Sequence, residues 1–224
     1  MKKVLILAAH PDDDVLGCGG ILSKFQKKTN FKVVFLGEGS TCRYNMPKSP
    51  DAIKEIKIRN GYAVNALNSL GVSDYSFYDL PCGRFNTIPL IEINKLIEKE
   101  IKSFKPDTVF THSKRDSNKD HVIIYESTII ATRPGSGVKK VLSYEVLSSS
   151  EWNYNNSFSP NVFISLSEKN IHDKCNALSM YLSETGPFPY PRSNEGVINL
   201  ANRRGIQCGS PYAEAFSLVR QFEI

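Results

Sequence analysis

The chain has 224 residues, of which 41% are hydrophobic and 23% are charged. These proportions are those of a globular protein, and the length suits one domain, so we expect a single domain over residues 1–224. The net charge of +5 is a small excess without a block of Lys or Arg, so composition makes no case for a nucleic-acid partner. We also expect no integral membrane segment, because no apolar run approaches the roughly 18 residues of a membrane span.

The five cysteines are scattered and form no CxxC pair. Disulfide frameworks and cysteine zinc sites need paired or regularly spaced cysteines, so this usage favours reduced thiols. No cysteine sits beside a histidine, which disfavours a cysteine nucleophile. The N-terminus runs directly into a strand-like segment rather than a signal peptide, and we therefore expect a cytoplasmic protein.

Strand-like and helix-like segments alternate through the first two thirds of the chain. In chain order, the hydrophobic pattern predicts a strand at residues 4–9, a helix at 15–27, a strand at 31–36, a helix at 53–70, a strand at 75–80, a helix at 88–104, a strand at 108–111, a helix at 121–132 and a strand at 139–146. Strands that alternate with helices indicate βαβ units, and hence a mostly parallel sheet with helices on both faces.

The last third is less regular. It predicts a short strand at residues 163–166, a helix at 168–183, a Pro-rich turn, a helix at 194–204 and a terminal segment at 213–219. No repeat, linker or change of composition marks a domain boundary, so we expect this part to wrap the same sheet.

The first predicted strand ends in a cluster of polar side chains. His10, Asp12, Asp13 and Asp14 follow an apolar run, with a proline between the first two. Ligands and catalytic groups gather at the carboxyl ends of strands in open α/β sheets. A surface turn rich in aspartate for solubility would not explain a histidine directly after six apolar residues.

A second cluster follows the fourth predicted strand, where His112 is followed by Asp116, Asp120 and His121. Two such clusters at two strand ends can converge above the sheet. A hydrolytic zinc site needs about three nitrogen or oxygen ligands, an open position for water and a nearby carboxylate. The two clusters contain these groups, whereas His172 has no such surroundings and is interpreted as structural.

The two clusters resemble the signature of the PIG-L (LmbE-like) family of zinc-dependent N-deacetylases. The matching segments are Ala9-His10-Pro11-Asp12-Asp13-Asp14 and Asn118-Lys119-Asp120-His121. Further similarities lie at Gly37-Glu38-Gly39, at Arg59 with the helix end Leu70-Gly71-Val72, and in the tail at Arg204-Gly205 and Tyr212-Ala213-Glu214-Ala215-Phe216. The resemblance extends over essentially the whole chain.

The resemblance implies that His10, Asp13 and His121 bind zinc, with Fe²⁺ or Co²⁺ as other ions that this set of ligands accepts. It implies that Asp12 is the general base that takes a proton from zinc-bound water. This agrees with general chemistry, because zinc lowers the pKa of bound water toward about 7 and one adjacent carboxylate can complete its activation.

Other residues are expected to orient the metal ligands or to contact the substrate. Asp14, Asp116 and Asp120 are expected around the ligands, where they would orient an imidazole or a loop. The resemblance implies that Arg59, Glu38 and Tyr212 contact the substrate. In this arrangement Arg59 would contact a substrate oxygen and the tail would reach the pocket.

The chain departs from the family pattern at one position. Many members place a histidine three residues before the zinc-binding histidine, where it stabilises the oxyanion, and this chain has Asn118 there. The resemblance leaves the second electrophile open among the Asn118 amide, His112 and no residue at all. We expect Asn118 to lie in the pocket and contribute.

Two other features of the sequence have simpler interpretations. The segment Gly17-Cys18-Gly19-Gly20 lacks the GxGxxG spacing of dinucleotide sites, so we expect these glycines to let a helix approach the sheet. Some arginines are candidates to hold an anionic group of a substrate, namely Arg43, Arg59, Arg84, Arg133 and Arg192. For any one of them, a surface or structural role is the simpler interpretation.

These expectations combine into one hypothesis: a Rossmann-like three-layer α/β domain that removes an acetyl group from an N-acetylated amino sugar or its conjugate. The substrate class, a small molecule or glycoconjugate, rests on the resemblance alone. The alternatives are a hydrolase of another amide, such as a thiol-conjugate amidase, and a metal-binding protein without catalytic activity. The sequence leaves open whether the chain forms a homo-oligomer.

Overall fold

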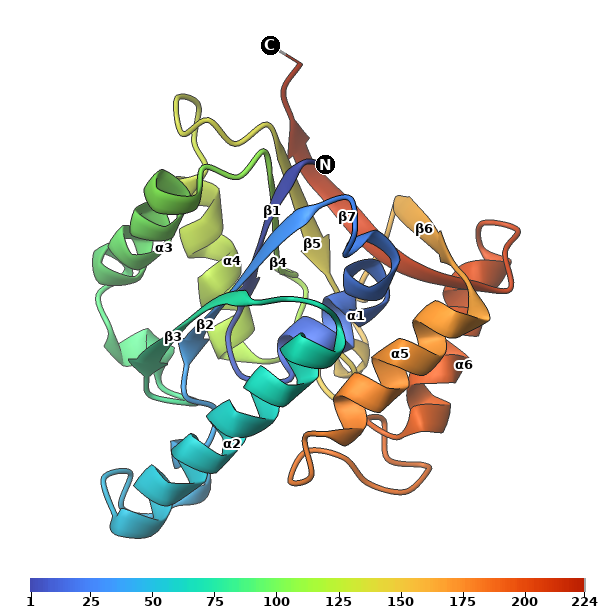
Figure 1. The fold of residues 1–224 in the computed structure, drawn as a ribbon. Helices are drawn as coiled ribbons and strands as arrows, with labels where there is room; N and C mark the ends of the chain where they lie inside the picture. Colours follow the sequence, from blue (N-terminus) through green and yellow to red (C-terminus); the bar gives the residue numbers. More distant parts are fainter. Residues whose placement is uncertain (224) are drawn as a thin grey trace.

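The computed structural model describes residues 1–223, and Figure 1 shows their fold. Its strands are β1 (Lys3–Ala8), β2 (Asn30–Gly37), β3 (Asp74–Leu80), β4 (Thr108–His112), β5 (Lys140–Tyr144), β6 (Val162–Leu166) and β7 (Tyr212–Gln221). Its α-helices are α1 (Asp13–Phe25), α2 (Pro50–Ser69), α3 (Leu90–Phe104), α4 (Lys119–Ala131), α5 (Glu168–Ser179) and α6 (Asn194–Ile206). Short 3₁₀ helices lie at η1 (Thr41–Arg43), η2 (Phe85–Thr87) and η3 (Ser150–Trp152).

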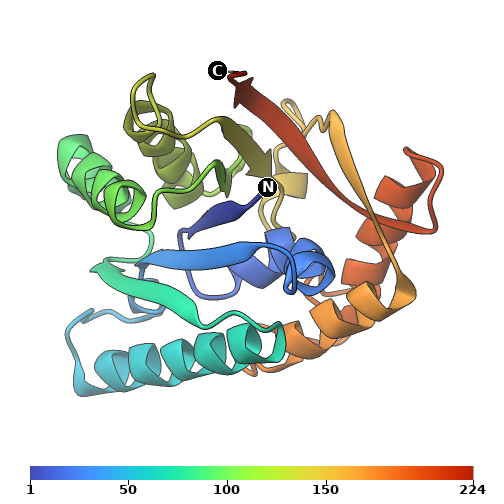
Figure 2. The ribbon, with the colours of Figure 1, turned by 45° about the horizontal axis from the view of Figure 1, so that its top comes forward.

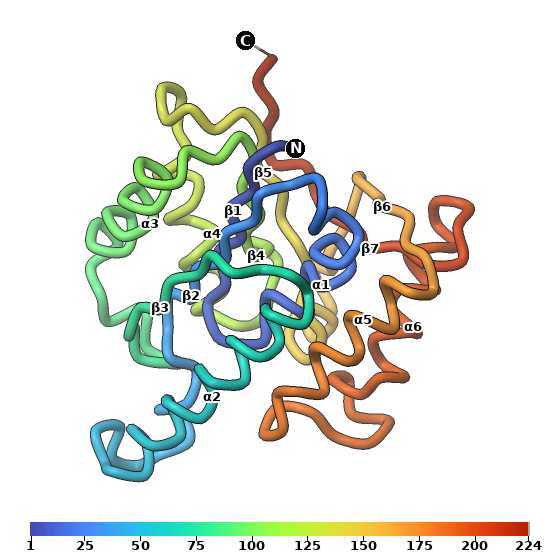
Figure 3. Tube along the Cα trace, viewed as in Figure 1, coloured from blue at the N-terminus to red at the C-terminus, as the bar shows by residue number. Residues whose placement is uncertain are grey.

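All seven strands form one sheet in the order β3-β2-β1-β4-β5-β7-β6. Strands β1 to β5 pair in parallel, and β7 pairs antiparallel with both β5 and β6. Figure 3 traces the chain through its crossovers to the long last strand. The prediction of a three-layer α/β fold with a mostly parallel sheet is confirmed.

The central strand β1 is apolar on both faces, and each face has its own core. Val4, Ile6 and Ala8 join a cluster with buried side chains from α1, α2, α5 and α6. Leu5 and Leu7 join a second cluster with side chains from α3 and α4. Figure 2 shows these two sets of helices on opposite sides of the sheet. A continuous apolar run is the pattern expected of a strand that is covered on both faces.

Most helices begin where a small polar residue precedes the first turn. Ser49 caps α2 ahead of Pro50, and Ser167 forms a capping box with Asn170 at the start of α5. These residues satisfy backbone N–H groups that have no partner within the helix. The predicted helix at 168–183 ends earlier, at Ser179, and the predicted terminal segment is the antiparallel strand β7.

Among the helices of residues 1–223, none combines the length and the apolar character of a membrane span.

The glycines of α1 allow close packing, as the sequence predicted. A Cβ atom on Gly17 would lie 2.2 Å from the Tyr144 ring, and one on Gly20 would lie 2.4 Å from Leu166 Cδ1. Both separations are far below van der Waals contact, so these positions require glycine for α1 to lie against β5 and β6.

A buried ion pair between α5 and β7 also binds backbone groups of α1. Lys174 Nζ lies 2.7 Å from Glu214 Oε1 and donates to the Leu16 carbonyl at 2.8 Å. Glu214 accepts the backbone N–H groups of Gly20 and Ile21 at 2.7 and 2.8 Å. This pair therefore ties the last third of the chain to the helix that follows β1.

We expect Lys174→Met to destabilise the protein by about 3–5 kcal/mol, because Glu214 would be left buried without its cation. The matched control is Lys169→Met on the same helix, where an exposed pair with Asp173 is worth about 0–1 kcal/mol. Urea unfolding measures both free energies. Equal losses in the two variants would contradict the role of Lys174 as the buried partner of Glu214.

Candidate active site

The side chains of both polar clusters meet at the carboxyl ends of the parallel strands. Strand β1 has β2 on one side and β4 on the other, so the crossovers reverse direction between β1 and β4. Such a switch point leaves a crevice between the loops that follow the two strands. The loop after β1 and the first turn of α1 supply His10 to Asp14, and the loop after β4 and the first turn of α4 supply Asp116 to His121.

Asp13 lies at the centre of this site, surrounded by three imidazoles. Its Oδ2 atom is 3.3 Å from His121 Nε2, 3.5 Å from His112 Nε2 and 3.6 Å from His10 Nδ1. The same oxygen accepts the His10 backbone N–H at 2.8 Å. Burial alone would raise the pKa of Asp13, but the neighbouring imidazoles of His121 and His112 hold it well below its usual range.

The residues expected to bind metal fit a divalent ion. The ligand atoms of His10, Asp13 and His121 lie within 4.8 Å of one another, and all three residues are buried. His121 Nε2 has no hydrogen-bond partner among the described residues, although it is fully buried. A tetrahedral ion with bonds of about 2.0–2.1 Å holds its ligand atoms about 3.3–3.4 Å apart, close to the separations around Asp13. Two imidazoles and one carboxylate suit Zn²⁺, Fe²⁺ or Co²⁺.

A carboxylate faces the outer nitrogen of each candidate imidazole ligand. Asp120 Oδ2 is 3.0 Å from His10 Nε2, and Asp116 Oδ2 is 3.2 Å from His121 Nδ1. With burial opposing them, Asp13 and Asp116 raise the pKa of His121 to about 10. The arrangement fixes the orientation of both rings, as carboxylates behind metal-binding histidines do.

The two outer carboxylates are themselves held in place. Asp120 accepts the backbone N–H groups of Gly83 and Phe85 at 2.6 and 3.1 Å, from the loop after β3. Asp116 accepts the hydroxyl groups of Ser149 and Ser150 at 3.1 and 2.7 Å. Loops after β3 and β5 therefore contribute to the site, although the three residues predicted to bind the metal lie elsewhere, and Cys82 of the loop after β3 lies within 4.8 Å of the ligand atoms of His10 and Asp120.

Asp12 has a strained backbone and two arginine partners. Its φ angle of 123° lies in a region that side-chain-bearing residues rarely adopt. Strain of this kind costs on the order of 1–3 kcal/mol and gathers at functional sites. Arg192 Nη1 lies 2.5 Å from Asp12 Oδ2, and Arg59 Nη2 lies 3.3 Å from Oδ1. Burial raises the pKa of Asp12 in spite of both guanidinium groups.

A glutamate from the Pro-rich segment completes this arginine cluster. Glu184 lies 2.7 Å from Arg43 and 3.2 Å from both Arg59 and Arg192. From the sequence, the three arginines were only candidates for anion binding, and Glu184 was not identified. Glu184 is 172 residues from Asp12 in the chain, and nothing in its local pattern indicated that the two would share partners.

Arg59 is buried, and its guanidinium group contacts other groups of the protein. It donates through Nε to the Pro11 carbonyl at 3.0 Å and through Nη1 to the Gly39 carbonyl, in addition to its contacts with Asp12 and Glu184. These contacts fix the loops after β1 and β2 around Asp12. Its predicted contact with a substrate oxygen remains a prediction.

The other two residues expected at the substrate have structural partners. Glu38 accepts the backbone N–H groups of Ser40, Thr41 and Cys82, so its carboxylate joins the loops after β2 and β3. Tyr212 pairs with Leu166 in the sheet and packs on the larger hydrophobic core. In the same tail Glu214 holds α1, so the described contacts of the tail are those of the fold.

His112 lies beneath the candidate ligands. Its Nε2 atom accepts the Ala9 backbone N–H at 2.8 Å, and its ring stacks on His121 with 3.9 Å between the ring centres. The side chain is fully buried, which lowers its pKa well below the usual value. A neutral His112 therefore packs against Asp13 and His121 and restricts their movement.

Asn118 and Asp14 flank the site at two helix starts. Asn118 caps α4, since its Oδ1 atom accepts the Asp120 backbone N–H at 3.0 Å. This leaves the amide N–H₂ group, on the other arm of the side chain, to donate elsewhere. Asp14 is buried against the Tyr181 hydroxyl at 3.2 Å, and burial raises its pKa to about 7.

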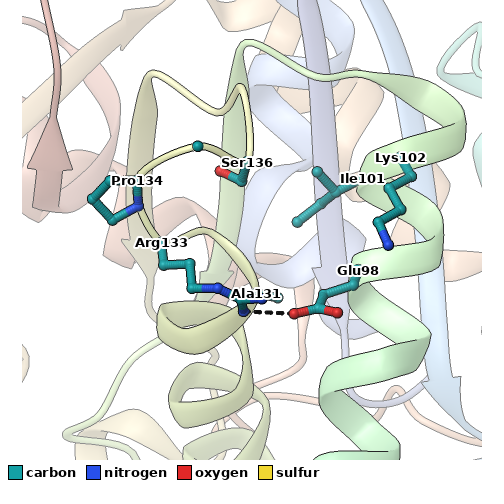
Figure 4. A pocket seen from close by; sticks show the side chains of 8 residues that line it. Glu98, Ile101, Lys102, Ala131, Arg133, Pro134 and Ser136 are labelled. Atoms are coloured by element: carbon teal, nitrogen blue, oxygen red, sulfur yellow. Dashed lines mark hydrogen bonds and ion pairs between the residues drawn. The ribbon is translucent and has the colours of Figure 1, made fainter.

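Two hollows on the surface differ in their relation to this site. Figure 4 shows one of about 290 Å³ between α3 and the turn after α4, where Arg133 and Glu98 pair at 2.6 Å. It lies at the amino ends of the strands, away from the site. The other, of about 670 Å³, is lined by the Pro-rich segment 183–191 and includes Glu184, so it adjoins the arginine cluster.

Comparison with known proteins identifies relatives of this chain. The PIG-L family, described as GlcNAc-PI de-N-acetylase, matches residues 5–132. The uncharacterized deacetylase YaiS of Escherichia coli K12 is 29% identical over 188 residues, which cover 81% of this chain and 91% of YaiS.

Solved structures share the fold at lower identity. The N,N′-diacetylchitobiose deacetylase of Pyrococcus horikoshii has a TM-score of 0.78 at 20% identity and covers 98% of this chain and 84% of its own. A deacetylase of teicoplanin biosynthesis has a TM-score of 0.79 at 18% identity and full coverage of both chains. GalB of Pseudomonas putida KT2440, a 4-carboxy-2-hydroxymuconate hydratase, has a TM-score of 0.75 at 20% identity, with 100% of this chain and 98% of its own covered. At these identities the likeness establishes the fold alone.

We expect the purified chain, stripped with a chelator and titrated with Zn²⁺, to bind about one ion, since the cluster of His10, Asp13 and His121 is buried and fits one. His121→Ala is expected to abolish binding. Asp116→Asn is expected to weaken it about 10–100-fold, the usual effect of losing a carboxylate behind a ligand. Calorimetry with elemental analysis measures both.

The matched control is His172→Ala, which removes an exposed imidazole from α5 and is expected to leave the binding unchanged. Full occupancy of the ion in His10→Ala would contradict the ligand assignment.

Proposed function

Because the chain belongs to the PIG-L family, we propose that it is a metal-dependent N-deacetylase acting on an N-acetylated amino sugar or its conjugate. The observation that carries the proposal is the buried carboxylate of Asp12 next to the cluster of His10, Asp13 and His121. A protein that only bound a metal would need the cluster without this further carboxylate. The names of the Escherichia coli and Pyrococcus relatives support the same class of reaction.

The metal supplies Lewis-acid chemistry when it is bound, since it lowers the pKa of a water molecule toward about 7 and polarises a carbonyl. His10, Asp13 and His121 would hold it, and Asp116 and Asp120 would orient the two imidazoles. His112, neutral and buried, would hold the side chains of Asp13 and His121 in their positions relative to each other.

Asp12 acts as the general base in this proposal. It accepts the proton of the attacking water and later delivers it to the leaving amine, so that the products are acetate and a free amine. Arg59 and Arg192 bind its two oxygens and keep the carboxylate directed at the reacting groups. The strained φ angle of Asp12 serves the same orientation.

We propose that the amide N–H₂ group of Asn118 donates a hydrogen bond to the carbonyl oxygen of the acetamide. Its Oδ1 atom is engaged as the helix cap, which fixes the amide plane and leaves its N–H₂ group as a neutral donor. A donor of this kind holds its strength across pH, unlike the imidazolium that many relatives use.

A substrate panel tests the proposed function. We would incubate the Zn²⁺-loaded protein with N-acetylglucosamine, its 1-phosphate, N,N′-diacetylchitobiose and an amide conjugate of a thiol. Acetate and free amine are measured separately, and equal amounts of both are expected with at least one N-acetyl sugar. An amine released with a larger acid would indicate an amidase instead. Bound metal with no turnover of any substrate would favour the binding protein without catalytic activity.

We expect Asp12→Asn to retain the metal and to lower kcat by about 10²–10⁴-fold, the usual contribution of a general base. Asn is nearly isosteric with Asp, so the metal stoichiometry and the melting temperature should change little. The control is Asp79→Asn, an exposed carboxylate on β3, with activity unchanged. A variant at Asp12 that works at the native rate would show that another group is the base.

A further inference from the structure

The fold brings together two cysteines that are far apart in the sequence. Cys42 lies in η1 after β2, and Cys82 lies in the loop after β3. Their Sγ atoms are 3.2 Å apart, although the residues are separated by 40 positions. Cys42 is exposed and Cys82 is buried, so one member of the pair is open to solvent and the other is not.

The loops that hold the two thiols share one clamp. The carboxylate of Glu38 accepts the backbone N–H of Thr41 at 2.9 Å and that of Cys82 at 2.7 Å. A disulfide has an S–S distance of about 2.05 Å, so the sulfur atoms need to approach by only about 1.1 Å. The clamp keeps the loops adjacent, and small rotations of the side chains cover this distance.

The surroundings of Cys42 favour its reactive form. The Cys82 thiol hydrogen-bonds to Cys42, and the Arg43 guanidinium lies nearby, and together they lower the pKa of Cys42 to about 6 against the effect of burial. The thiolate is the form of cysteine that attacks peroxides and disulfides.

We propose that Cys42 and Cys82 are an oxidative modification site, at which a peroxide converts the pair to a reversible disulfide that weakens the active site. The Cys42 thiolate attacks one peroxide oxygen, the O–O bond breaks, and a sulfenic acid and one water form. The Cys82 sulfur then attacks the sulfenic sulfur, the S–S bond forms, and a second water leaves. The two thiols lose two electrons and two protons in total, and the peroxide is reduced to two waters.

The position of the pair connects this disulfide to the active site. Cys82 Sγ lies within 4.8 Å of the ligand atoms of His10 and Asp120. The next residue, Gly83, donates its backbone N–H to Asp120 Oδ2 at 2.6 Å, and that oxygen faces His10 Nε2 at 3.0 Å. Movement of Cys82 toward Cys42 therefore displaces the carboxylate that orients a candidate metal ligand.

The other half of the pair is connected to Asp12. Arg43, adjacent to Cys42, lies 2.7 Å from Glu184, which in turn contacts Arg192 beside Asp12. The disulfide would therefore disturb the site from two sides. Loss of such supporting contacts lowers metal affinity or activity about 10–100-fold. The effect on activity rests on the proposed function, whereas formation of the disulfide does not.

The first test is chemical and uses the full chain loaded with Zn²⁺, which does not itself undergo redox chemistry. After treatment with hydrogen peroxide, trypsin digestion without reductant is expected to yield one cross-linked species from the peptides 33–43 and 60–84. Mass spectrometry identifies it by the loss of two hydrogens, and dithiothreitol should separate the peptides. Cys42 found only as a sulfinic acid, or no cross-link, would overturn the proposal.

The second test is functional and compares two serine variants. Cys42→Ser is expected to keep basal activity and to resist peroxide, while the native protein loses activity about 10–100-fold and recovers with dithiothreitol. Cys208→Ser removes an exposed cysteine outside the pair and should respond to peroxide as the native chain does. Equal inactivation of native protein and Cys42→Ser would overturn the link to the site.

If the proposed deacetylase activity is itself wrong, Zn²⁺ affinity replaces activity as the readout. Oxidation is then expected to lower the affinity of native protein and to leave that of Cys42→Ser unchanged.

Discussion

The rest of the site depends on how one buried carboxylate, Asp13, is stabilised. An ionised carboxylate loses its hydration when it is buried and needs charged or hydrogen-bonding partners in return. The imidazoles of His121 and His10 and the His10 backbone N–H supply them, and the neutral His112 ring packs against His121. Each of those partners must itself be held in the correct orientation. Further carboxylates orient the imidazoles, and neighbouring loops hold these carboxylates in place.

The four other carboxylates of the two polar clusters are accommodated in different ways. Asp116 and Asp120 face imidazoles and accept backbone or hydroxyl hydrogens. Asp12 is bound by two guanidinium groups. Asp14 has a hydroxyl partner and a pKa raised to about 7 by burial, so it carries a proton part of the time at neutral pH. These separate solutions allow five acidic side chains to be buried at one edge of the sheet.

Much of this arrangement was predictable because it is local to strand ends. The apolar run before His10 identified a buried strand, and the similar run before His112 identified a second one. Since both strands are parallel and adjacent, their carboxyl ends had to meet. The imidazoles and carboxylates that follow the two strands are of the types that bind metals, so the sequence predicted where these side chains gather and offered metal chemistry as a hypothesis for them.

The unpredicted parts are those that depend on long-range pairing. The antiparallel strand β7 lies between β5 and β6, an order that a strand-by-strand pattern does not encode. Glu38 and Tyr212 were assigned to the substrate on the family resemblance, which did not indicate the partners they have within the protein, Cys82 in the loop after β3 and Leu166 in β6. The cysteines seemed scattered because the sequence separation of Cys42 and Cys82 conceals their proximity.

The same long-range contacts explain why the last third of the chain belongs to the site. Arg192 reaches Asp12 from a segment 180 positions away, and Glu184 joins it to Arg43 and Arg59. Lys174 and Glu214 fasten that part of the chain to α1, the helix that starts at Asp13. The strained backbone of Asp12 can persist only if its surroundings oppose relaxation. The arginines oppose it at the side chain and the anchored helix opposes it at the backbone, so the geometry of the proposed base depends on the complete fold.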